Sequence, residues 1–441
     1  MIKILFVSLG CDKNLVDSET MIGLLQDKGY EITNEEKDAD VVIINSCCFI
    51  GDAKEESIET IIELGKLKET GRLKALIVTG CLAQRYKDEI LKELPEVDAM
   101  IGTMSIESIG EAVDASLKEK GYSHFEDIDY LPKIYDKRAI ASGSYTGYLK
   151  IAEGCNKRCT YCVIPSVRGS YRSIPMEAVM AQAVHLANNG VRELCLVAQE
   201  TTLYGLDLYG RKSLPKLLQM LSSIEDLKWI RLLYCYPEEI TDELISEIKS
   251  NPKVCHYIDM PIQHCENAVL KRMGRATTKE EILERISYIR KEIPDIVLRT
   301  SLIAGFPGET KEEHEALMEF VDEVEFNRLG VFTYSLEEDT PAASFDNQVP
   351  EEVKEQWRAE IMELQQEVSY DRNASMVGQC MEVIVDGYVY KDDMYMCRSY
   401  MDAPDIDGMV FVHSEEELVT GDFIKVKIVD FNEYDLIGER I

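Results

Sequence analysis

Short apolar runs of strand length recur between residues 148 and 332, and helical segments lie between most of them. Strands that alternate with helices predict parallel pairing, because a crossover connection is needed to bring the next strand back in the same direction. We therefore expect a TIM-type barrel of βα units, complete or partial, with its active site at the carboxyl ends of the strands. The runs are Tyr148–Ile151, Glu193–Val197, Trp229–Leu233, Val254–Met260, Ile296–Ile303 and Leu329–Phe332.

The first third of the sequence repeats this alternation on a smaller scale. Three buried apolar runs are separated by amphipathic helical segments, which again predicts a parallel sheet. Tyr130-Leu-Pro-Lys and the small, polar stretch Ala141-Ser-Gly-Ser are typical of a linker. We therefore expect a flavodoxin-like domain over residues 1–135, with ligands beyond the carboxyl ends of its strands. The expected strands are Ile2–Ser8, Val41–Asn45 and Ala75–Thr79, and the expected helices are Ser18–Lys28 and Glu55–Lys68.

The pattern changes near residue 374 to short alternating strands that Gly and Asp turns interrupt, at Met381–Val385, Val410–Val412 and Phe423–Val429. Such a segment predicts a small β-barrel over residues 374–441. Residues 141–372 are then left for the βα barrel. Three domains suit a chain of 441 residues, since a single core seldom grows beyond about 250 to 300 residues. The predicted fold is an α/β multidomain protein that ends in a small β-barrel.

Charge limits the partners that this chain can bind. The formal net charge is −33, and the segment from Ala374 to Ile441 holds fifteen Asp and Glu against five Lys and Arg. Such a surface repels a phosphate backbone and attracts a basic partner, so nucleic acid is not the expected substrate. The sequence has no cationic leader with a cleavage site and no apolar run of membrane-spanning length. We therefore expect a cytoplasmic protein with no membrane partner.

A tight group of three cysteines occurs in the segment Gly154-Cys155-Asn-Lys-Arg-Cys159-Thr-Tyr-Cys162, which follows a predicted strand and so lies on a loop. Three thiolates on one loop can bind three corners of a cubane iron–sulfur cluster. A fourth thiolate is missing from the run, which leaves one iron open to another ligand. A structural zinc site is the alternative, but such sites typically pair two arms, and no second arm lies at suitable spacing.

A second group of cysteines is spread over the first domain, where Cys11, Cys47 and Cys81 each follow a predicted strand. Because the carboxyl ends of neighbouring parallel strands meet at one edge of a sheet, we expect these three side chains to form one site. Cys48 directly follows Cys47, and adjacent side chains seldom serve one site equally. Other isolated cysteines are interpreted as small buried hydrophobes, namely Cys195, Cys235, Cys255, Cys380 and Cys397.

The CxxxCxxC loop, with an aromatic residue before its last cysteine, resembles the radical S-adenosylmethionine superfamily. The resemblance implies that Cys155, Cys159 and Cys162 hold a four-iron, four-sulfur (4Fe-4S) cluster whose open iron chelates S-adenosylmethionine. One-electron reduction then releases a 5′-deoxyadenosyl radical. Tyr161 would lie near the adenine, although simple packing is an alternative for this ring. Polar residues that follow or flank other strands are candidates for contacts with S-adenosylmethionine, namely Gln199, Glu200, Gln263 and Glu309.

The whole chain is similar to the methylthiotransferase family, which joins such an N-terminal domain to a radical barrel and a C-terminal TRAM module. The resemblance implies that Cys11, Cys47 and Cys81 hold an auxiliary 4Fe-4S cluster whose open iron carries the sulfur or methylthio group to be inserted. We choose Cys47 over Cys48 because Cys47 stands where the family motif has its ligand. This chain departs from the usual pattern at Glu200, where Asp is frequent, and at Cys48, where Gly is usual. Neither departure removes a ligand.

The opening Val7-Ser-Leu-Gly-Cys-Asp-Lys-Asn14 resembles the RimO branch of that family. This branch methylthiolates the β-carbon of an aspartate in ribosomal protein twelve of the small subunit. Further agreement runs through the barrel, for example at Cys162-Val-Ile-Pro-Ser-Val-Arg168-Gly. The transfer-RNA branch typically reads GCQMN where this sequence has Gly-Cys-Asp-Lys-Asn. The acidic C-terminal segment also suits a basic ribosomal protein.

The resemblance implies two partners, which are the small-subunit ribosomal protein, free or in the assembled subunit, and an electron donor such as flavodoxin or ferredoxin. Three alternatives remain. A transfer-RNA adenosine methylthiotransferase would be expected to carry a basic last domain, so transfer RNA is not the favoured partner. A non-catalytic iron–sulfur carrier would never cleave S-adenosylmethionine, and a zinc-stabilised interaction protein would be colourless. The sulfur source and the oligomeric state do not follow from the sequence.

Overall fold

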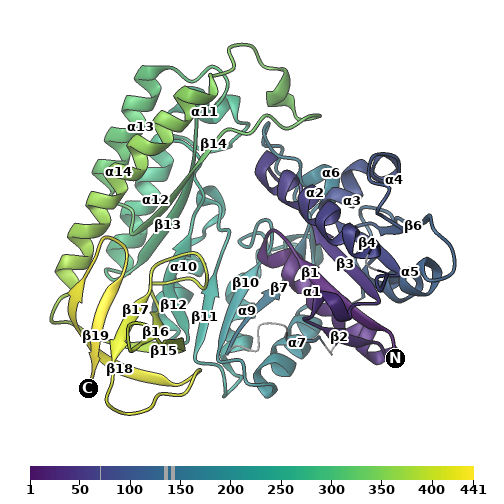
Figure 1. Ribbon diagram of the computed structural model, residues 1–441. Helices are drawn as coiled ribbons and strands as arrows, with labels where there is room; N and C mark the ends of the chain where they lie inside the picture. Colours follow the sequence, from purple (N-terminus) through teal and green to yellow (C-terminus); the bar gives the residue numbers. More distant parts are fainter. Residues whose placement is uncertain (70, 134–137, 141–144) are drawn as a thin grey trace.

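The structure is a computed structural model that describes residues 1–69, 71–133, 138–140 and 145–441. Figure 1 shows an N-terminal α/β part on the right, a central sheet with outer helices, and a small β-barrel at the lower left. The predicted end of the first domain at residue 135 and the predicted start of the second at residue 141 lie outside the described residues. Within those ranges, no helix is both long enough and apolar enough to cross a membrane.

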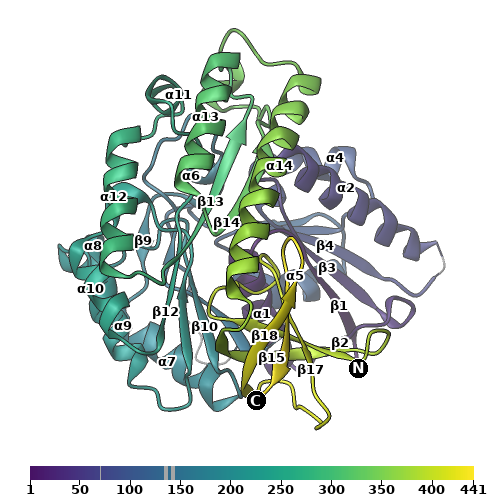
Figure 2. The same ribbon diagram turned by 90° about the vertical axis from the view of Figure 1, so that its left-hand side faces the viewer.

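The N-terminal part is a parallel sheet with strand order β2-β1-β3-β4-β5-β6, the flavodoxin-like order extended by one strand. Successive residues of its central strands enter two separate cores, one on each face, because side chains alternate along a strand. Helices cover both faces (Figure 2). The elements are β1 (Lys3–Ser8), α1 (Asp12–Asp27), β2 (Glu31–Thr33), η1 (Glu36–Asp38), β3 (Val41–Ser46), α2 (Gly51–Gly65), η2 (Lys66–Lys68), β4 (Ala75–Gly80), α3 (Cys81–Tyr86), α4 (Asp88–Glu93), β5 (Ala99–Ile101), η3 (Ile106–Ser108), α5 (Ile109–Ser116) and β6 (Tyr122–His124).

Helix α1 begins at Asp12, six residues before the predicted start at Ser18. Its first turns bury Lys13, Asn14 and Asp17, so they lack the apolar period that marks an amphipathic helix. Polar residues are buried here because this end of the helix packs against the central domain, where it contacts β7. An unusual buried polar surface thus identifies the helix as part of an interface.

The central part is a sheet of six parallel strands in the order β14-β13-β12-β11-β10-β7, and each strand matches one predicted run. The sheet has two free edges, so the predicted barrel is a partial one. The elements are β7 (Thr146–Lys150), β8 (Ala152–Glu153), α6 (Ile164–Arg168), β9 (Arg172–Ser173), α7 (Met176–Asn188), β10 (Glu193–Val197), α8 (Leu206–Tyr209), α9 (Leu214–Ser222), β11 (Trp229–Leu232), η4 (Pro237–Glu239), α10 (Asp242–Ser250), β12 (Val254–Asp259), α11 (Asn267–Arg272), α12 (Lys279–Glu292), β13 (Val297–Ala304), α13 (Lys311–Val324), β14 (Arg328–Thr333) and η5 (Pro341–Ser344).

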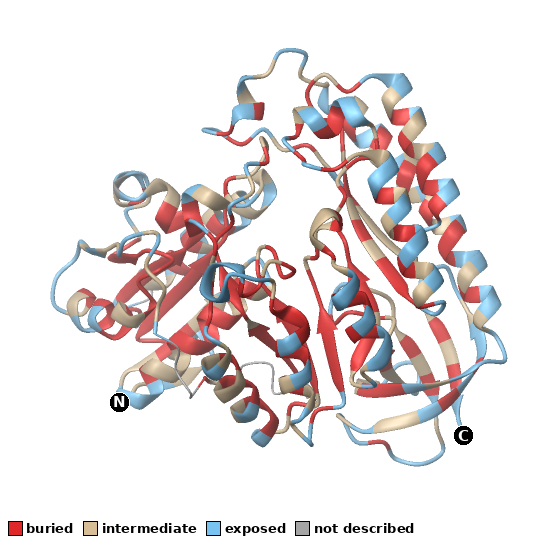
Figure 3. Cartoon of the chain, turned by 180° about the vertical axis from the view of Figure 1, so that it is seen from behind, coloured by how far each residue is buried: buried red, intermediate tan, exposed pale blue. Residues whose placement is uncertain are grey.

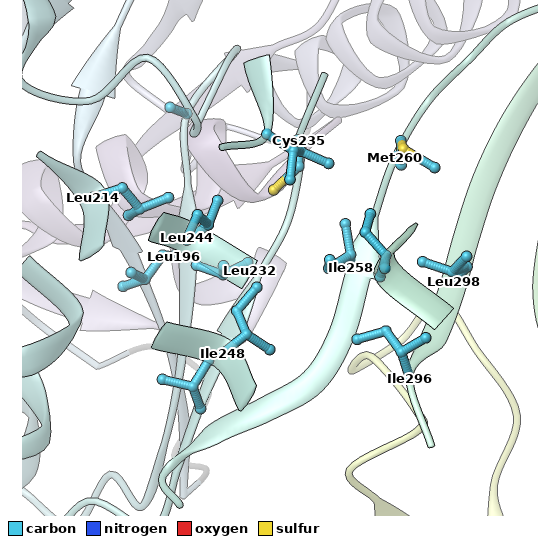
Figure 4. Close-up of a cluster of buried hydrophobic side chains, with 14 of the residues drawn as sticks. Leu196, Leu214, Leu232, Cys235, Leu244, Ile248, Ile258, Met260, Ile296 and Leu298 are labelled. Atoms are coloured by element: carbon cyan, nitrogen blue, oxygen red, sulfur yellow. The ribbon is translucent and has the colours of Figure 1, made fainter. Parts of the chain in front are cut away.

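The outer helices pack on this sheet through one large apolar core. Figure 4 shows Leu196, Leu232 and Ile258 of the strands in one cluster with Leu244 and Ile248 of α10. In Figure 3 the strands of both parallel sheets are mostly buried, whereas the outward faces of the helices are exposed. The core therefore fixes the strands and leaves their carboxyl ends free to carry polar side chains.

Helix α14 (Glu351–Met376) runs along the central part and leads into a closed five-stranded barrel of order β15-β16-β17-β19-β18. The predicted C-terminal β-barrel is confirmed, although only three of its strands were expected. The interpretation of isolated cysteines as buried is confirmed for Cys195, Cys235, Cys255 and Cys397, but it is wrong for Cys380, which is exposed where β15 begins. The strands are β15 (Cys380–Val389), β16 (Met394–Ser399), β17 (Val410–His413), β18 (Phe423–Phe431) and β19 (Leu436–Arg440).

The loop between β16 and β17 enters the amino-terminal end of the central barrel. Arg231, which is fully buried, donates from Nη1 to Tyr400 O at 2.7 Å, and Tyr257 donates its hydroxyl proton to Asp407 Oδ2 at 2.6 Å. Arg398 of β16 lies 2.8 Å from Glu193 at the start of β10. The C-terminal barrel therefore closes one end of the central barrel and leaves the opposite end, at the strand carboxyl ends, for a site.

Removal of the buried guanidinium at this interface is expected to be strongly destabilising. Arg398→Met leaves Asp386 and Glu193 short of a partner at 2.7 and 2.8 Å, and breaking a buried pair costs about 3 to 5 kcal/mol. Arg440→Met is the control, because it breaks an exposed pair with Glu416 that is worth less than about 1 kcal/mol. The shift of the urea midpoint for the full-length chain measures both effects. Equal shifts for the two variants would contradict this account of the interface.

Candidate functional site

The predicted cluster loop leaves the first central strand through a turn that only glycine fits. Gly154 has φ +76°, and a Cβ there would lie 2.1 Å from Ser170 O. The turn directs Cys155 toward the segment of Gly169 and Ser170, where the Cys155 backbone N–H donates to Gly169 O at 3.1 Å. Cys155 and Cys159 are buried, and Cys162 is half-buried. The chain thus encloses its three thiols in one short loop at the carboxyl end of β7 and β8.

The three thiols of this loop interact electrostatically. The pKa of Cys155 is raised to about 11 and that of Cys162 to about 12, chiefly by burial and in part by the neighbouring Cys159. Bound cations reverse such shifts, because a coordinating thiol is deprotonated outright. Among the described residues, no three Cys, His, Asp or Glu side chains surround a single metal ion. That arrangement does not argue against a cluster, whose three cysteines bind three different irons rather than converging on one.

Tyr161 lies in an aromatic group beside the loop. Its ring meets Phe306 edge to face, with 6.4 Å between centroids. Arg275 stacks over the ring of Tyr236 at 4.1 Å and interacts with the Tyr161 hydroxyl group. The predicted place for an adenine is therefore bordered by flat rings and a guanidinium, which are surfaces that stack on a base. Packing against Phe306 also agrees with the simpler interpretation of Tyr161.

Gln199 and Glu200 follow β10 and carry buried polar atoms. Gln199 donates from Nε2 to Glu153 Oε1 at 3.1 Å, and Glu200 accepts a hydrogen bond from Thr202 N at 3.0 Å. Within the described part of the chain, Gln199 Oε1, Glu200 Oε2 and two nitrogens of Arg275 are buried without a hydrogen-bond partner. Buried polar atoms are normally paired, so this group fits a polar ligand such as S-adenosylmethionine. Arg275 was missed, since a lone arginine after a short helix has no sequence pattern.

The other two candidates differ in their surroundings. Gln263 follows β12 with a left-handed backbone (φ 71°), which is rare for a residue with a side chain and is typical of strained positions at functional sites. Glu309 is buried in the turn after β13, where its Oε2 accepts from Phe306 N at 2.8 Å and its Oε1 lies 3.3 Å from His264 Nε2. Both carboxylate oxygens of Glu309 thus already have partners, one in its own turn and one at His264 after β12. A contact between either residue and a cofactor stays a prediction.

The second predicted site is assembled at the carboxyl ends of β1, β3 and β4. Gly10 lets the loop after β1 approach Cys47 closely, since a Cβ at Gly10 would lie 2.8 Å from Cys47 Sγ. The pKa of Cys47 is raised to about 12, chiefly by burial and in part by Cys81 and Cys11. The structure therefore brings the three cysteines near one another, as the parallel sheet predicts. Cys48 belongs to the apolar core under the sheet, although it also interacts with Cys81.

The N-terminal domain covers the open end of the central barrel. Tyr234, directly after β11, donates its hydroxyl proton to Asp12 Oδ2 at 3.1 Å, next to Cys11. On another side, Arg85 of α3 lies 2.7 Å from Glu337 in the loop after β14. Cys11 therefore lies beside the carboxyl end of β11, at the same end of the central barrel as the loop of Cys155, Cys159 and Cys162.

The raised pKa of Glu200 predicts that the free energy of unfolding depends on pH. Burial raises its pKa from 4.5 to about 8, so the folded chain keeps a proton that the unfolded chain releases. This stabilisation is complete below about pH 4.5 and is lost as the pH rises through 8. Without ligand, the free energy of unfolding of the native sequence should fall by up to roughly 5 kcal/mol relative to Glu200→Gln over that range. Urea unfolding of both proteins at a series of pH values measures the difference, and parallel curves would contradict the shift.

Comparison with known proteins gives matches along the whole chain. Residues 3–102 match Uncharacterized protein family UPF0004, residues 149–321 the Radical SAM superfamily, and residues 377–441 the TRAM domain. The chain is 56% identical over 436 residues to the ribosomal protein uS12 methylthiotransferase RimO of Lachnoclostridium phytofermentans, with 99% of each chain covered. It is 49% identical over 443 residues to the protein of that name from Clostridioides difficile, with 100% of this chain and 99% of that one covered.

Solved structures share the fold at low sequence identity. The radical S-adenosylmethionine methyltransferase TsrM of Kitasatospora setae, with cobalamin and an iron–sulfur cluster bound, matches with a TM-score of 0.54 at 15% identity, over 78% of this chain and 77% of that one. The cobalamin-dependent S-adenosylmethionine radical enzyme OxsB in its apo form matches with a TM-score of 0.55 at 13% identity, over 81% of this chain and 56% of that one. These two likenesses support the arrangement of an α/β domain beside a partial barrel.

Proposed function

This chain belongs to the RimO family of methylthiotransferases, and we propose that it transfers a methylthio group to the β-carbon of an aspartate in small-subunit ribosomal protein uS12. It is a transferase of the radical S-adenosylmethionine superfamily. The observation that carries the proposal is the 56% identity to a relative of that name over 99% of the chain. Such an alignment includes both cysteine sites and the C-terminal barrel.

In this proposal the first cysteine site holds the 4Fe-4S cluster that the superfamily implies, through Cys155, Cys159 and Cys162. With S-adenosylmethionine bound, the cluster supplies a 5′-deoxyadenosyl radical that removes hydrogen from the target carbon. The chain's own residues bind and shield the cofactor. Gln199 and Glu200 offer buried oxygens to its ammonium group or ribose. Closure by the N-terminal domain keeps water from the radical.

The second cysteine site, formed by Cys11, Cys47 and Cys81, holds an auxiliary 4Fe-4S cluster in this proposal. That group supplies the sulfur or methylthio group to be inserted, and a second S-adenosylmethionine supplies the methyl group. The position of the site supports this division, because Cys11 lies next to the contact between Asp12 and Tyr234 at the carboxyl end of β11. The role of the protein is to hold the two sites at a fixed separation, so that the carbon radical meets sulfur before it meets solvent.

The charge of the chain supports a basic protein as the substrate. The net charge is −33, and uS12 as a ribosomal protein is expected to be basic, so attraction speeds their encounter and transfer RNA is disfavoured. Reduction requires an electron donor, for which flavodoxin or ferredoxin is the proposed class.

The test offers both candidate substrates to the same enzyme. The protein is reconstituted with iron and sulfide under anaerobic conditions, reduced, and incubated with S-adenosylmethionine and either small ribosomal subunits or transfer RNA. We expect uS12 to gain one methylthio group on an aspartate, while 5′-deoxyadenosine and S-adenosylhomocysteine accumulate. A gain on adenosine in transfer RNA would overturn the proposed substrate. Absence of 5′-deoxyadenosine would overturn the proposed chemistry.

A further inference from the structure

A buried ionic network lies between the two cysteine sites. Arg168, at the end of α6, is 2% exposed, and its Nη1 lies 2.7 Å from Asp17 Oδ2 and 3.2 Å from Glu153 Oε2. Lys150 Nζ contacts the same two carboxylates, at 2.6 Å from Glu153 Oε2. Asp17 comes from the N-terminal domain and the other three residues from the central domain. Two cations and two anions therefore share one buried region across the domain interface.

One arm of Arg168 reaches the auxiliary site. Its Nη2 donates to Asn14 Oδ1, which fixes the orientation of that amide. Asn14 Nδ2 in turn donates to Leu9 O at 2.9 Å and to Ser46 O at 3.1 Å. These carbonyls stand just before the first and second cysteines of the site, and the third, Cys81, has its Sγ 3.9 Å from Asn14 Oδ1. Through the Asn14 amide, Arg168 is thus linked to all three chain segments that carry the auxiliary thiols.

The other arm of Arg168 reaches the radical site. Glu153, its second acceptor, directly precedes the glycine turn into Cys155, and its Oε1 accepts from Gln199 Nε2 at 3.1 Å. Gln199 carries one of the buried oxygens offered to S-adenosylmethionine. The Arg168 guanidinium therefore contacts residues that hold the cysteine segments of both sites in place, Asn14 at the auxiliary site and Glu153 at the radical site.

We propose that Arg168 is a positioning residue that holds the two sites in register and supplies positive charge to the auxiliary cluster. This inference rests on the proposed function, because it requires the second cluster. Lysine could supply the charge, but its single nitrogen cannot replace the two separate nitrogens of Arg168, of which Nη1 donates to the carboxylates and Nη2 to the amide. Arg168 interacts electrostatically with each of the three thiols. A nearby positive charge favours the reduced, more negative state of a cluster and so raises its reduction potential.

The first measurement isolates the auxiliary cluster. Full-length chain in which Cys155, Cys159 and Cys162 are replaced by alanine is reconstituted, and the reduction potential is followed by electron paramagnetic resonance. Arg168→Gln should lower the potential, and Arg168→Lys should leave it near that of the parent. Arg231→Gln is the matched control, since Arg231 is equally buried and paired with Glu193 at 2.9 Å but lies at the opposite end of the barrel. It should destabilise the chain without shifting the potential.

The second measurement uses the enzyme with both sites intact and counts 5′-deoxyadenosine formed per methylthio group transferred. Both Arg168→Gln and Arg168→Lys should raise this ratio severalfold, because the radical forms while the sulfur site is displaced. Arg231→Gln should leave the ratio unchanged. If the Arg168→Gln variant cannot retain iron, the ratio measured for Arg168→Lys tests the positioning role.

The outcomes separate the inference from the function on which it rests. If the parent lacking the three loop cysteines binds no 4Fe-4S cluster, the proposed second cluster is wrong and the inference falls with it. If the cluster binds but Arg168→Gln leaves its reduction potential unchanged, the charge role is overturned and the proposed function stands. An unchanged ratio in Arg168→Lys overturns the positioning role in the same way.

Discussion

Cys159→Ser is expected to abolish formation of 5′-deoxyadenosine in the reconstituted, reduced enzyme. Cys159 is the central thiol of the loop and influences the acidity of both Cys155 and Cys162, so its loss removes one corner of the proposed cluster. A serine hydroxyl is a poor substitute, since iron–sulfur clusters are held by thiolates and a serine side chain stays protonated at neutral pH. We expect a loss of at least about 1,000-fold, which corresponds to roughly 4 kcal/mol of barrier.

A matched control separates loss of the cluster from loss of a buried thiol. Cys265 is also buried in the central domain, and its Sγ lies 3.6 Å from Ala316 O. Serine at that position can make the same contact, so Cys265→Ser should keep most of the activity and all of the iron. Iron content and 5′-deoxyadenosine are measured together by chemical assay and chromatography. Iron loss and inactivity in both variants would mean that the loop cysteines are structural.

The order of strands and the places of the cysteines could be predicted because both depend on local patterns. Each apolar run of the central part became one strand, since a short buried run bounded by helices has few alternatives. Cys11, Cys47 and Cys81 could be grouped because parallel strands bring equivalent ends together. Three strands of the first sheet were missed because runs of three residues, such as Ala99–Ile101, carry too little pattern.

Contacts between polar side chains that are far apart in the sequence could not be predicted. Arg168 and Asn14 are 154 residues apart, and Lys150 and Asp17 are 133 apart, so no period or spacing connects them. The burial of Asp17 even concealed the start of α1, because a polar face on a helix is normally taken as a solvent face. Such pairs form where two domains pack together. Each buried charge needs a partner there, because an unpaired charge would be too costly to bury.

Cys47 and Cys48 provide the sharpest test of the auxiliary site, because they are adjacent, chemically identical and both buried. We expect Cys47→Ala to abolish methylthio transfer to uS12, again by at least about 1,000-fold or roughly 4 kcal/mol, while 5′-deoxyadenosine still forms at the radical site. Cys47 lies against Gly10, in the loop that carries Cys11, whereas Cys48 packs in the apolar core. Mass spectrometry of uS12 and chromatography of the nucleoside products measure the two reactions.

Cys48→Ala should therefore keep both reactions and lose only packing. Removal of one sulfur from a filled core costs on the order of 1 kcal/mol, far less than the loss of a ligand. If instead Cys48→Ala stopped transfer and Cys47→Ala did not, the ligand would be Cys48, and the turn after β3 would have to rotate to present it. If neither variant lost transfer, no thiol of this pair would hold the auxiliary cluster. The radical chemistry would then depend on the cysteine loop of the central domain alone. Sulfur would have to reach the substrate from a donor other than the N-terminal site.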